Sequence, residues 1–165
     1  MEDQTLQEKL TEKANEIIDE ATRPLMNILL QIQKATSHES GAMRLSMDDL
    51  YTIAIRIPVE CSFLQAHINE RSIKQSLQDI VTDAMITDSI TILKGAKGDA
   101  KERQRRAEAM NQEQRLTDET ARQIIQALQA TINRADKVYE GVKKVIDSRS
   151  RENNFDRKPG YPIGT

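Results

Sequence analysis

Apolar residues recur at steps of three and four along most of this chain, which is the spacing of amphipathic α-helices. The stripe of the first segment consists of Leu6, Leu10, Ala14, Ile17 and Ala21. Pro24 follows this stripe. Because its ring removes a backbone donor and disfavours helical geometry at Arg23, the sequence predicts a break or kink there. A short apolar run over residues 25–32 comes next, and residues 35–46 have the composition of a loop.

A second helical pattern begins at Ser46, whose hydroxyl can cap the first turn, with Asp48 and Asp49 placed favourably for the helix dipole. Its stripe consists of Leu50, Ile53, Ala54, Ile57, Cys61, Leu64, Ile68, Ile73, Leu77, Ile80, Val81 and Ala84. Pro58 is expected to kink this helix without ending it, because the pattern resumes in phase. Since the pattern weakens over residues 87–95, the segment is predicted to form one long, kinked helix or two helices in line.

The last segment has the strongest periodicity of the chain. Its a and d rows, at heptad spacing, are Ala121, Leu128, Ala135 and Val142 together with Ile125, Ile132, Tyr139 and Ile146. A third row consists of Ile124, Thr131, Val138 and Val145. This row widens the apolar face enough to contact two neighbouring helices. The pattern therefore favours a bundle, and is compatible with an oligomer, over an isolated two-stranded coil.

These patterns predict an all-α protein, an elongated helical bundle with a long C-terminal oligomerising helix. The length of 165 residues fits one domain, and the low aromatic content of 3% favours helices packed on helices. We expect an acidic amphipathic segment at residues 1–35 and a helical core at residues 46–152 with a basic loop at residues 94–106. Residues 153–165 contain two prolines and two glycines without periodicity, which predicts a disordered tail or, given its two aromatic residues, a docking peptide.

Charge is segregated along the chain. The net charge of -2 is too small to attract nucleic acid to the whole protein, so any contact with a polyanion must come from a local patch. Residues 1–20 contain seven acidic side chains against two lysines, whereas residues 94–106 contain six cations against Asp99 and Glu102. The second of these segments is therefore the candidate patch.

The cysteine content and the N-terminus are typical of a cytosolic protein. Cys61 is the only cysteine, so an intramolecular disulfide is impossible, and its apolar helical surroundings predict a small buried thiol. The N-terminus lacks the basic start and the apolar run of a signal peptide, and no apolar stretch approaches the ~18 residues of a membrane span. We therefore expect a soluble, cytoplasmic protein that is neither exported nor inserted into a membrane.

Catalytic and metal-binding patterns have little support in this sequence. Gly95 and Gly98 are three residues apart and follow a helical pattern, whereas a Walker A loop needs G-x-x-x-x-G-K-[ST] after a strand. His67 lies six residues after Cys61, on a different face of the helix, and His38 falls in the predicted loop. Adjacent carboxylates, as in the stretch MDDL, point apart and lack a partner base. We expect no enzymatic activity, no metal site and no cofactor.

The basic stretch LKGAKGDAKERQRR, residues 93–106, is the best remaining chemical signal. Asp99 can cap a helix that begins at Ala100 and carries its cations on two faces. Such a segment can lie along a phosphodiester backbone, with the glycines allowing a close approach, while the lack of nearby aromatic residues argues against base-specific readout. Repetition around an oligomer would raise the avidity for single strands by roughly 10²-fold or more. A solvated connection is the alternative interpretation.

Three stretches resemble small phage proteins related to the UvsY-type recombination mediators: LYTIAIRIPVECSFLQAHINE, ILKGAKGDAKERQRRAE and INRADKVYEGVKKVIDSRSRE. The resemblance covers residues 46–152 and concerns architecture. It implies an all-helical homo-oligomer, often a ring, that binds single-stranded DNA. It also implies that the protein helps a RecA-like recombinase to displace single-strand-binding protein. A protein of this family that is encoded by a phage would act in the cytoplasm of the bacterial host.

The same resemblance implies roles for individual residues. The DNA contacts would be Lys94, Lys97, Lys101, Arg103, Arg105 and Arg106. The assembly contacts would be Ile125, Leu128, Ile132, Tyr139, Val142 and Ile146. The acidic first segment departs from the family, and we expect it either to dock on a recombinase or to mask the basic loop. The second hypothesis is a non-enzymatic protein-interaction module, such as a phage factor that binds a host or phage protein through this acidic helix.

Overall fold

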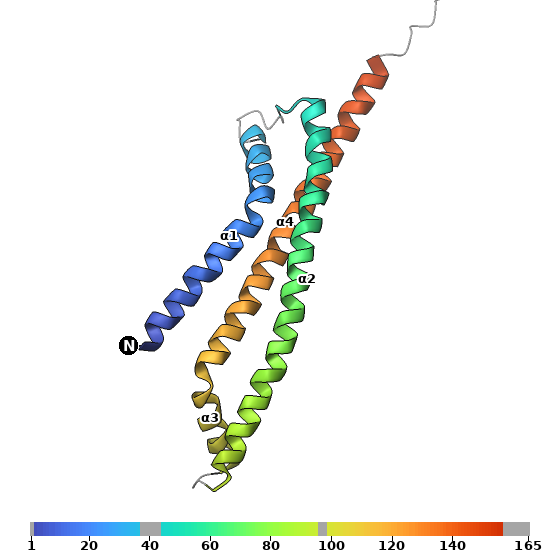
Figure 1. Ribbon diagram of the computed structural model, residues 1–165. Coiled ribbons are helices and arrows are strands. Elements are labelled where there is room, and N and C mark those ends of the chain that lie inside the picture. Colours follow the sequence, from blue (N-terminus) through green and yellow to red (C-terminus); the bar gives the residue numbers. More distant parts are fainter. Residues whose placement is uncertain (1, 37–43, 96–98, 157–165) are drawn as a thin grey trace, which may run out of the picture. The chain divides into compact units, whose positions relative to one another are not determined.

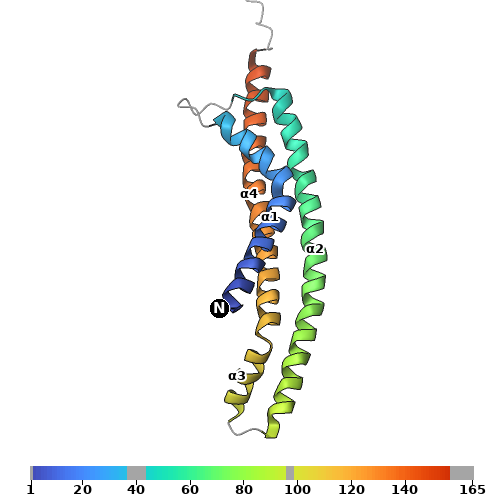
Figure 2. The same cartoon turned by 60° about the vertical axis from the view of Figure 1, so that its left-hand side comes forward.

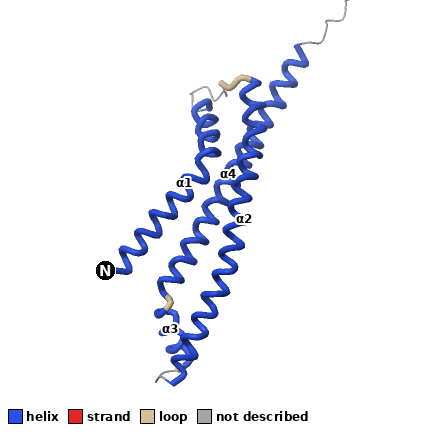
Figure 3. Tube along the Cα trace, in the orientation of Figure 1, coloured by secondary structure: helices blue, strands red, loops and turns tan. Residues whose placement is uncertain are grey.

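The computed structural model describes residues 2–36, 44–95 and 99–156, nearly all of them helical (Figures 1 and 3). The helices are α1 (Glu2–Thr36), α2 (Met47–Ile92), the 3-10 turn η1 (Leu93–Gly95), α3 (Ala100–Met110) and α4 (Gln112–Asp156). No strand occurs within the described ranges. The predicted all-α class is therefore confirmed.

Two helices begin at the residues whose side chains were predicted to cap them. The backbone N–H and the hydroxyl of Ser46 donate to the Asp49 carboxylate at 3.2 and 2.6 Å, and the Asp49 backbone N–H donates to the Ser46 hydroxyl oxygen at 3.1 Å. This reciprocal capping box starts α2, and its hydrogen bonds to the charged carboxylate lower the pKa of Asp49. At the start of α3, the Asp99 carboxylate accepts a hydrogen bond from the Glu102 backbone N–H at 2.7 Å.

Neither interior proline ends its helix. α1 continues through Pro24 and α2 through Pro58. Of the break or kink predicted at Pro24, the break does not occur, and α2 is the single long helix of the two alternatives. Apolar residues next to the prolines are fully packed, since Leu25 and Ile57 are 1% and 0% exposed. This packing outweighs the loss of one helical hydrogen bond at each proline.

The predicted connections are shorter than expected where the structure describes them. Helix α1 includes the first two residues of the predicted loop, and α4 includes residues 153–156 of the predicted tail. Residues 37–43 and 157–165 lie outside the described residues.

The chain divides by its internal contacts into two units. Unit 1 contains residues 1–22 and 64–130, and unit 2 contains residues 23–63 and 131–165. In unit 2 the predicted apolar stripes face inward. Its buried apolar side chains are Leu25, Ile28, Leu29, Ile32, Leu50, Ile53, Ile57, Cys61, Ile132, Ala135 and Val142. The guanidinium of Arg149 also donates to the carbonyl oxygen of Leu45 at 2.5 Å, which ties the last part of α4 to the residues that precede α2.

Unit 1 contains a helical hairpin. The second half of α2 and the first part of α4 lie side by side in opposite directions, with η1 and α3 at the end of the hairpin (Figures 1 and 2). The buried apolar side chains of this unit are Ala14, Leu64, Ile68, Ala107, Ile124 and Leu128. Among the described residues between Ile68 and Ile124, Ala107 alone is apolar and buried, so the hairpin has a small apolar core.

The apolar stripe of α2 changes face within unit 1, so the single stripe predicted for this helix is wrong. Ile73, Leu77 and Ile80 are 64%, 61% and 66% exposed. The residues buried at this level of α2 are Gln75 and Thr82. The stripe moves because five residues separate Ile68 from Ile73, which turns its direction by about 140° around the helix axis.

Candidate nucleic-acid interface

The basic segment forms the end of the unit 1 hairpin (Figure 2). Lys94 belongs to η1, and α3 carries Lys101, Arg103, Arg105 and Arg106. Lys97 lies outside the described residues. The structure thus brings four of the six predicted DNA contacts together on a helix of 11 residues, which Asp99 caps as predicted.

The cations of this segment differ in how far they are neutralised. Arg106 donates to the Glu102 carboxylate at 2.5 Å, although its side chain stays 49% exposed. Lys101 and Arg105 lie one helical turn apart, are exposed and form no ion pair with the described residues. Lys94 is exposed as well. The positive charge available to a ligand is therefore concentrated on these last three side chains, since Arg103 is half-buried.

A groove at the junction of α3 and α4 begins beside Arg105. Its volume is about 370 Å³, and it is lined by Arg105, Glu108, Ala109, Gln112, Arg115, Leu116 and Glu119. Arg115 is paired with Glu108 at 2.9 Å. Of the two arginines in the groove, Arg105 is therefore the one that can pair with a phosphate without first leaving a carboxylate.

The interior of the hairpin is a polar seam, which consists of Gln75, Thr82 and Ser89 of α2 facing Asn111 and Asp118. These side chains are 5% to 8% exposed. The Thr82 hydroxyl donates to the Asp118 carboxylate at 2.7 Å, and the Asn111 amide donates to the Ser89 hydroxyl oxygen at 3.1 Å. Every buried side-chain nitrogen and oxygen of the described residues has a hydrogen-bond partner. One feature of the sequence could have indicated this seam: its polar residues are spaced seven apart, both on α2 and across Asn111 and Asp118.

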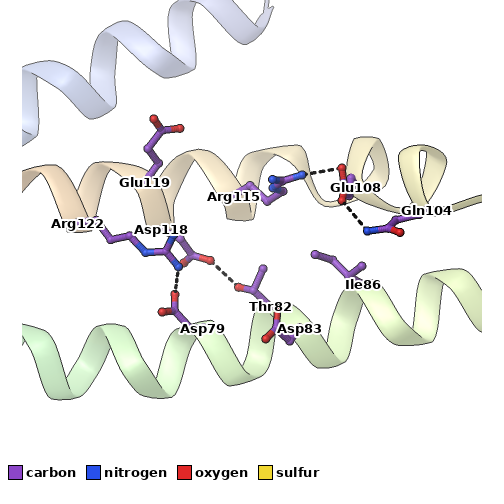
Figure 4. Close-up of a pocket in the computed structure, with 10 residues that line it drawn as sticks. All are labelled: Asp79, Thr82, Asp83, Ile86, Gln104, Glu108, Arg115, Asp118, Glu119 and Arg122. Atoms are coloured by element: carbon purple, nitrogen blue, oxygen red, sulfur yellow. Dashed lines mark hydrogen bonds and ion pairs between the residues drawn. The ribbon is translucent and has the colours of Figure 1, made fainter. Parts of the chain in front are cut away.

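A polar cleft of about 580 Å³ adjoins the seam (Figure 4). It is lined by Asp79, Thr82, Asp83, Ile86, Gln104, Glu108, Arg115, Asp118, Glu119 and Arg122. Figure 4 shows the Arg122 guanidinium of α4 reaching the Asp79 carboxylate of α2, at 2.8 Å. The Gln75 amide donates to the same carboxylate at 2.8 Å. The hydrogen bond from Gln75 and that from Arg122 lower the pKa of Asp79.

The side chains of this cleft form no arrangement typical of catalysis. Its lining residues include five carboxylates and two arginines but no histidine, cysteine, serine or tyrosine. Both arginines are paired, Arg115 with Glu108 and Arg122 with Asp79. The cross-helix bonds instead fix how α2 is aligned with α4, which is a known effect of polar groups in helix pairs.

The residues assigned to assembly by the resemblance lie largely inside the chain. Leu128, Ile132 and Val142 are 0%, 7% and 1% exposed, whereas Ile125, Tyr139 and Ile146 are half-buried. The first three residues pack within the chain and are not available to a second chain in this conformation. These three side chains contribute to the interior of the single chain, and the assembly role of all six residues stays a prediction.

The cysteine and the histidines are not brought together in the described structure. Burial raises the pKa of the Cys61 thiol, with smaller contributions from Asp136 and Glu60, so the thiol stays protonated and weakly nucleophilic. His67 is exposed, and His38 lies outside the described residues. Within residues 2–36, 44–95 and 99–156, no group of three or more histidine, cysteine, aspartate or glutamate side chains is placed to hold a metal ion.

Comparison of the chain with protein-family models, with curated proteins and with solved structures finds no match in any of the three. None of the described helices combines the length and the apolar character that crossing a membrane requires.

Proposed function

We propose that this chain is a non-enzymatic, self-associating helical protein that binds single-stranded DNA through the end of its unit 1 hairpin. One observation carries the proposal: Lys94, Lys101 and Arg105 are exposed close together in the chain, at the end of a hairpin. Three exposed cations in one place attract a polyanion even though the net charge of the whole chain is slightly negative.

The chemistry of this surface favours backbone contacts over base recognition. Lys101 and Arg105 are one turn apart on α3, so their Cβ atoms are separated by about 6 Å and can contact neighbouring phosphates of a flexible strand. No aromatic residue occurs in η1 or α3 on which a base could stack. We therefore expect binding that depends on salt and tolerates any sequence.

The finer role we propose is that of a recombination mediator, which assists the loading of a RecA-like recombinase on strands covered by single-strand-binding protein. Its support is the resemblance of residues 46–152 to the UvsY-type family. Three cations bind a strand weakly, so the role requires several copies of the hairpin end in one assembly, which raises avidity. Recombinase ATPase activity on covered single strands measures this role directly, and we expect the protein to increase it.

Fluorescence anisotropy with a labelled single-stranded oligonucleotide tests DNA binding. We expect the double variant Lys101→Ala/Arg105→Ala to bind more weakly. The steepness of the fall of log K with log salt concentration should decrease by about 1.4, since each phosphate contact contributes ~0.7 to this slope. The matched control is Lys137→Ala/Lys144→Ala, which removes two exposed cations of α4 outside the hairpin end. Equal binding by both variants would refute the assignment.

A protein-interaction module is the second candidate function, because α1 exposes a row of acids. Glu8, Glu12, Glu16, Asp19 and Glu20 are all exposed. A basic surface of a protein partner is the chemistry that fits them. A pull-down from nuclease-treated host lysate, comparing the natural chain with Glu12→Lys/Glu16→Lys, tests this function: a stoichiometric partner retained by the variant would rule out α1 as the contact.

A further inference from the structure

An ordinary helical hairpin buries apolar residues between its helices and exposes polar ones. The part of the unit 1 hairpin beyond Ile68 has the reverse arrangement. The side of α2 that faces α4 carries the polar seam, whereas the opposite side carries the large apolar residues. These outer residues are Ile73, Leu77, Ile80, Val81, Met85 and Ile92, which are 44% to 76% exposed. We call these six residues the outer face of α2.

The outer face is a continuous surface along one helix. From Ile73 to Ile92 it extends about 28 Å, at a rise of ~1.5 Å per residue. Charged residues on or beside this surface are few: Glu70 and Lys74, which pair with each other at 2.6 Å, and Asp88. Contiguous exposed apolar surfaces of this kind mark interaction sites, because leaving them in water is unfavourable.

We infer that the outer face of α2 binds the same face of a second copy of this chain, in an antiparallel pair with its two-fold axis at Val81. This inference deepens the self-association in the proposed function and rests on it. In an antiparallel pair, residues equally far from the axis on either side face each other. Lys74 of one copy then lies opposite Asp88 of the other, and Leu77 opposite Met85.

Charge complementarity selects the antiparallel pair. Lys74, Val81 and Asp88 follow one another at steps of seven and therefore lie on one side of the outer face. A two-fold axis across the helices brings this side against the same side of the second copy, so that each Lys74 meets an Asp88. Like charges stay apart, because the two Asp88 side chains are separated by about 21 Å along the axis.

A parallel pair of the same helices would be unfavourable. It would place Asp88 of one chain opposite Asp88 of the other, and Glu70 of one chain opposite Glu70 of the other. Like charges at the same level of a helix pair repel each other, whereas the antiparallel pair places each Lys74 directly opposite an Asp88. The charges of α2 thus specify both the direction and the alignment of the two copies.

The size of the outer face fits a weak dimer. A large apolar side chain has roughly 60–120 Å² of area that burial removes from water. The six residues of each chain are 44% to 76% exposed, so together the two chains can bury about 700 Å² of apolar area. With the polar share that interfaces commonly have, the total comes to about 1,200 Å², at the lower end of specific interfaces. We expect a dissociation constant in the micromolar range.

Sedimentation velocity of the full chain without DNA tests the charge pair. We expect the natural chain to dimerise at tens of micromolar, and each of Lys74→Asp and Asp88→Lys to weaken the dimer about tenfold. The double variant should restore it, because the opposite charges again face each other. The control Ile55→Asp, at an exposed apolar residue of α2 outside this alignment, should leave the dimer unchanged. Circular dichroism checks that all variants stay helical.

Cysteine cross-linking in a Cys61→Ala background tests the alignment. The cysteine of Val81→Cys meets its own copy at the two-fold axis and should oxidise to a dimer, whereas that of Ile73→Cys lies about 24 Å from its copy along the helix axis and should not. Cross-linking of Ile73→Cys, a monomeric natural chain, or a double charge variant that fails to restore the dimer would each overturn the inference. Because sedimentation uses no DNA, a failed dimer is distinguished from failed DNA binding, which the anisotropy experiment measures separately.

Discussion

Replacement of Thr82 by Val removes the hydrogen bond at the centre of the polar seam while keeping the shape of the side chain. The Thr82 hydroxyl donates to the Asp118 carboxylate at 2.7 Å, and the two residues are 6% and 5% exposed. After the replacement, Asp118 retains the amide of Gln114, which donates to its other oxygen at 3.2 Å. One carboxylate oxygen is then left buried without its donor.

The expected loss of stability follows from this burial. Hydrogen bonds to charged groups contribute about 1.5–3 kcal/mol, and a buried acceptor without its donor incurs a desolvation penalty. We therefore expect Thr82→Val to lower the free energy of unfolding by about 2 kcal/mol, which for a chain of this size lowers the melting temperature by roughly 4–8 °C. Replacing both partners, as in Thr82→Val/Asp118→Leu, should regain most of this loss because no polar group then lacks a partner.

Thermal and urea unfolding followed by circular dichroism measure the effect, and amide hydrogen exchange locates it. Thr87→Val is the matched control, because Thr87 is exposed on the same helix and donates only to the carbonyl oxygen of Asp83. Its effect should stay within about 0.5 kcal/mol. Exchange should become faster in residues 75–90 of Thr82→Val. A melting temperature for Thr82→Val equal to that of Thr87→Val would show that the seam does not stabilise the hairpin.

Two further predictions concern Asp99 and Asp79. Asp99→Ala should destabilise α3 by about 1 kcal/mol through loss of its N-cap, whereas Asp99→Ser should preserve the cap. NMR chemical shifts of residues 100–110 measure the helicity of both variants, and equal helicity would contradict the capping role. Because the pKa of Asp79 is lowered in the folded chain, its interactions stabilise the fold above the ordinary pKa of 3.8, and this stabilisation is lost as the pH falls through the lowered value. Arg122→Ala should raise the pKa of Asp79 only part of the way back to its ordinary value, because the hydrogen bond from Gln75 remains. NMR titration of the Asp79 carboxyl carbon measures this, and an unchanged pKa would refute it.

Local signals in the sequence predicted the helices and their starting points. The caps at Ser46 and Asp99 depend only on interactions between residues within four positions of each other, so they can be predicted from the local sequence. At Pro24 the sequence left a break and a kink open. The helix is continuous there because neighbours such as Leu25 are buried, which is a tertiary effect that the local sequence does not contain.

The candidate site was predicted less completely than the helices. The cluster of cations at the end of the hairpin follows from sequence position, but the pairing of Arg106 with Glu102 requires the conformations of both side chains. The polar seam was missed because Gln75, Thr82 and Ser89 look like a solvent-facing row, while the apolar row around Leu77 looks like the core. Periodicity gives the faces of a helix but not which face is covered.

A single residue, Asn111, separates α3 from α4. Its amide donates to the Ser89 hydroxyl oxygen of α2 and to the Ala107 carbonyl oxygen, at 3.1 and 2.8 Å, so this joint is anchored on both sides. The direction in which Lys101 and Arg105 point is consequently set by the number of residues in the joint. Insertion or deletion of one residue there would rotate both cations by roughly 100° about the helix axis without altering any charge or any residue of α3.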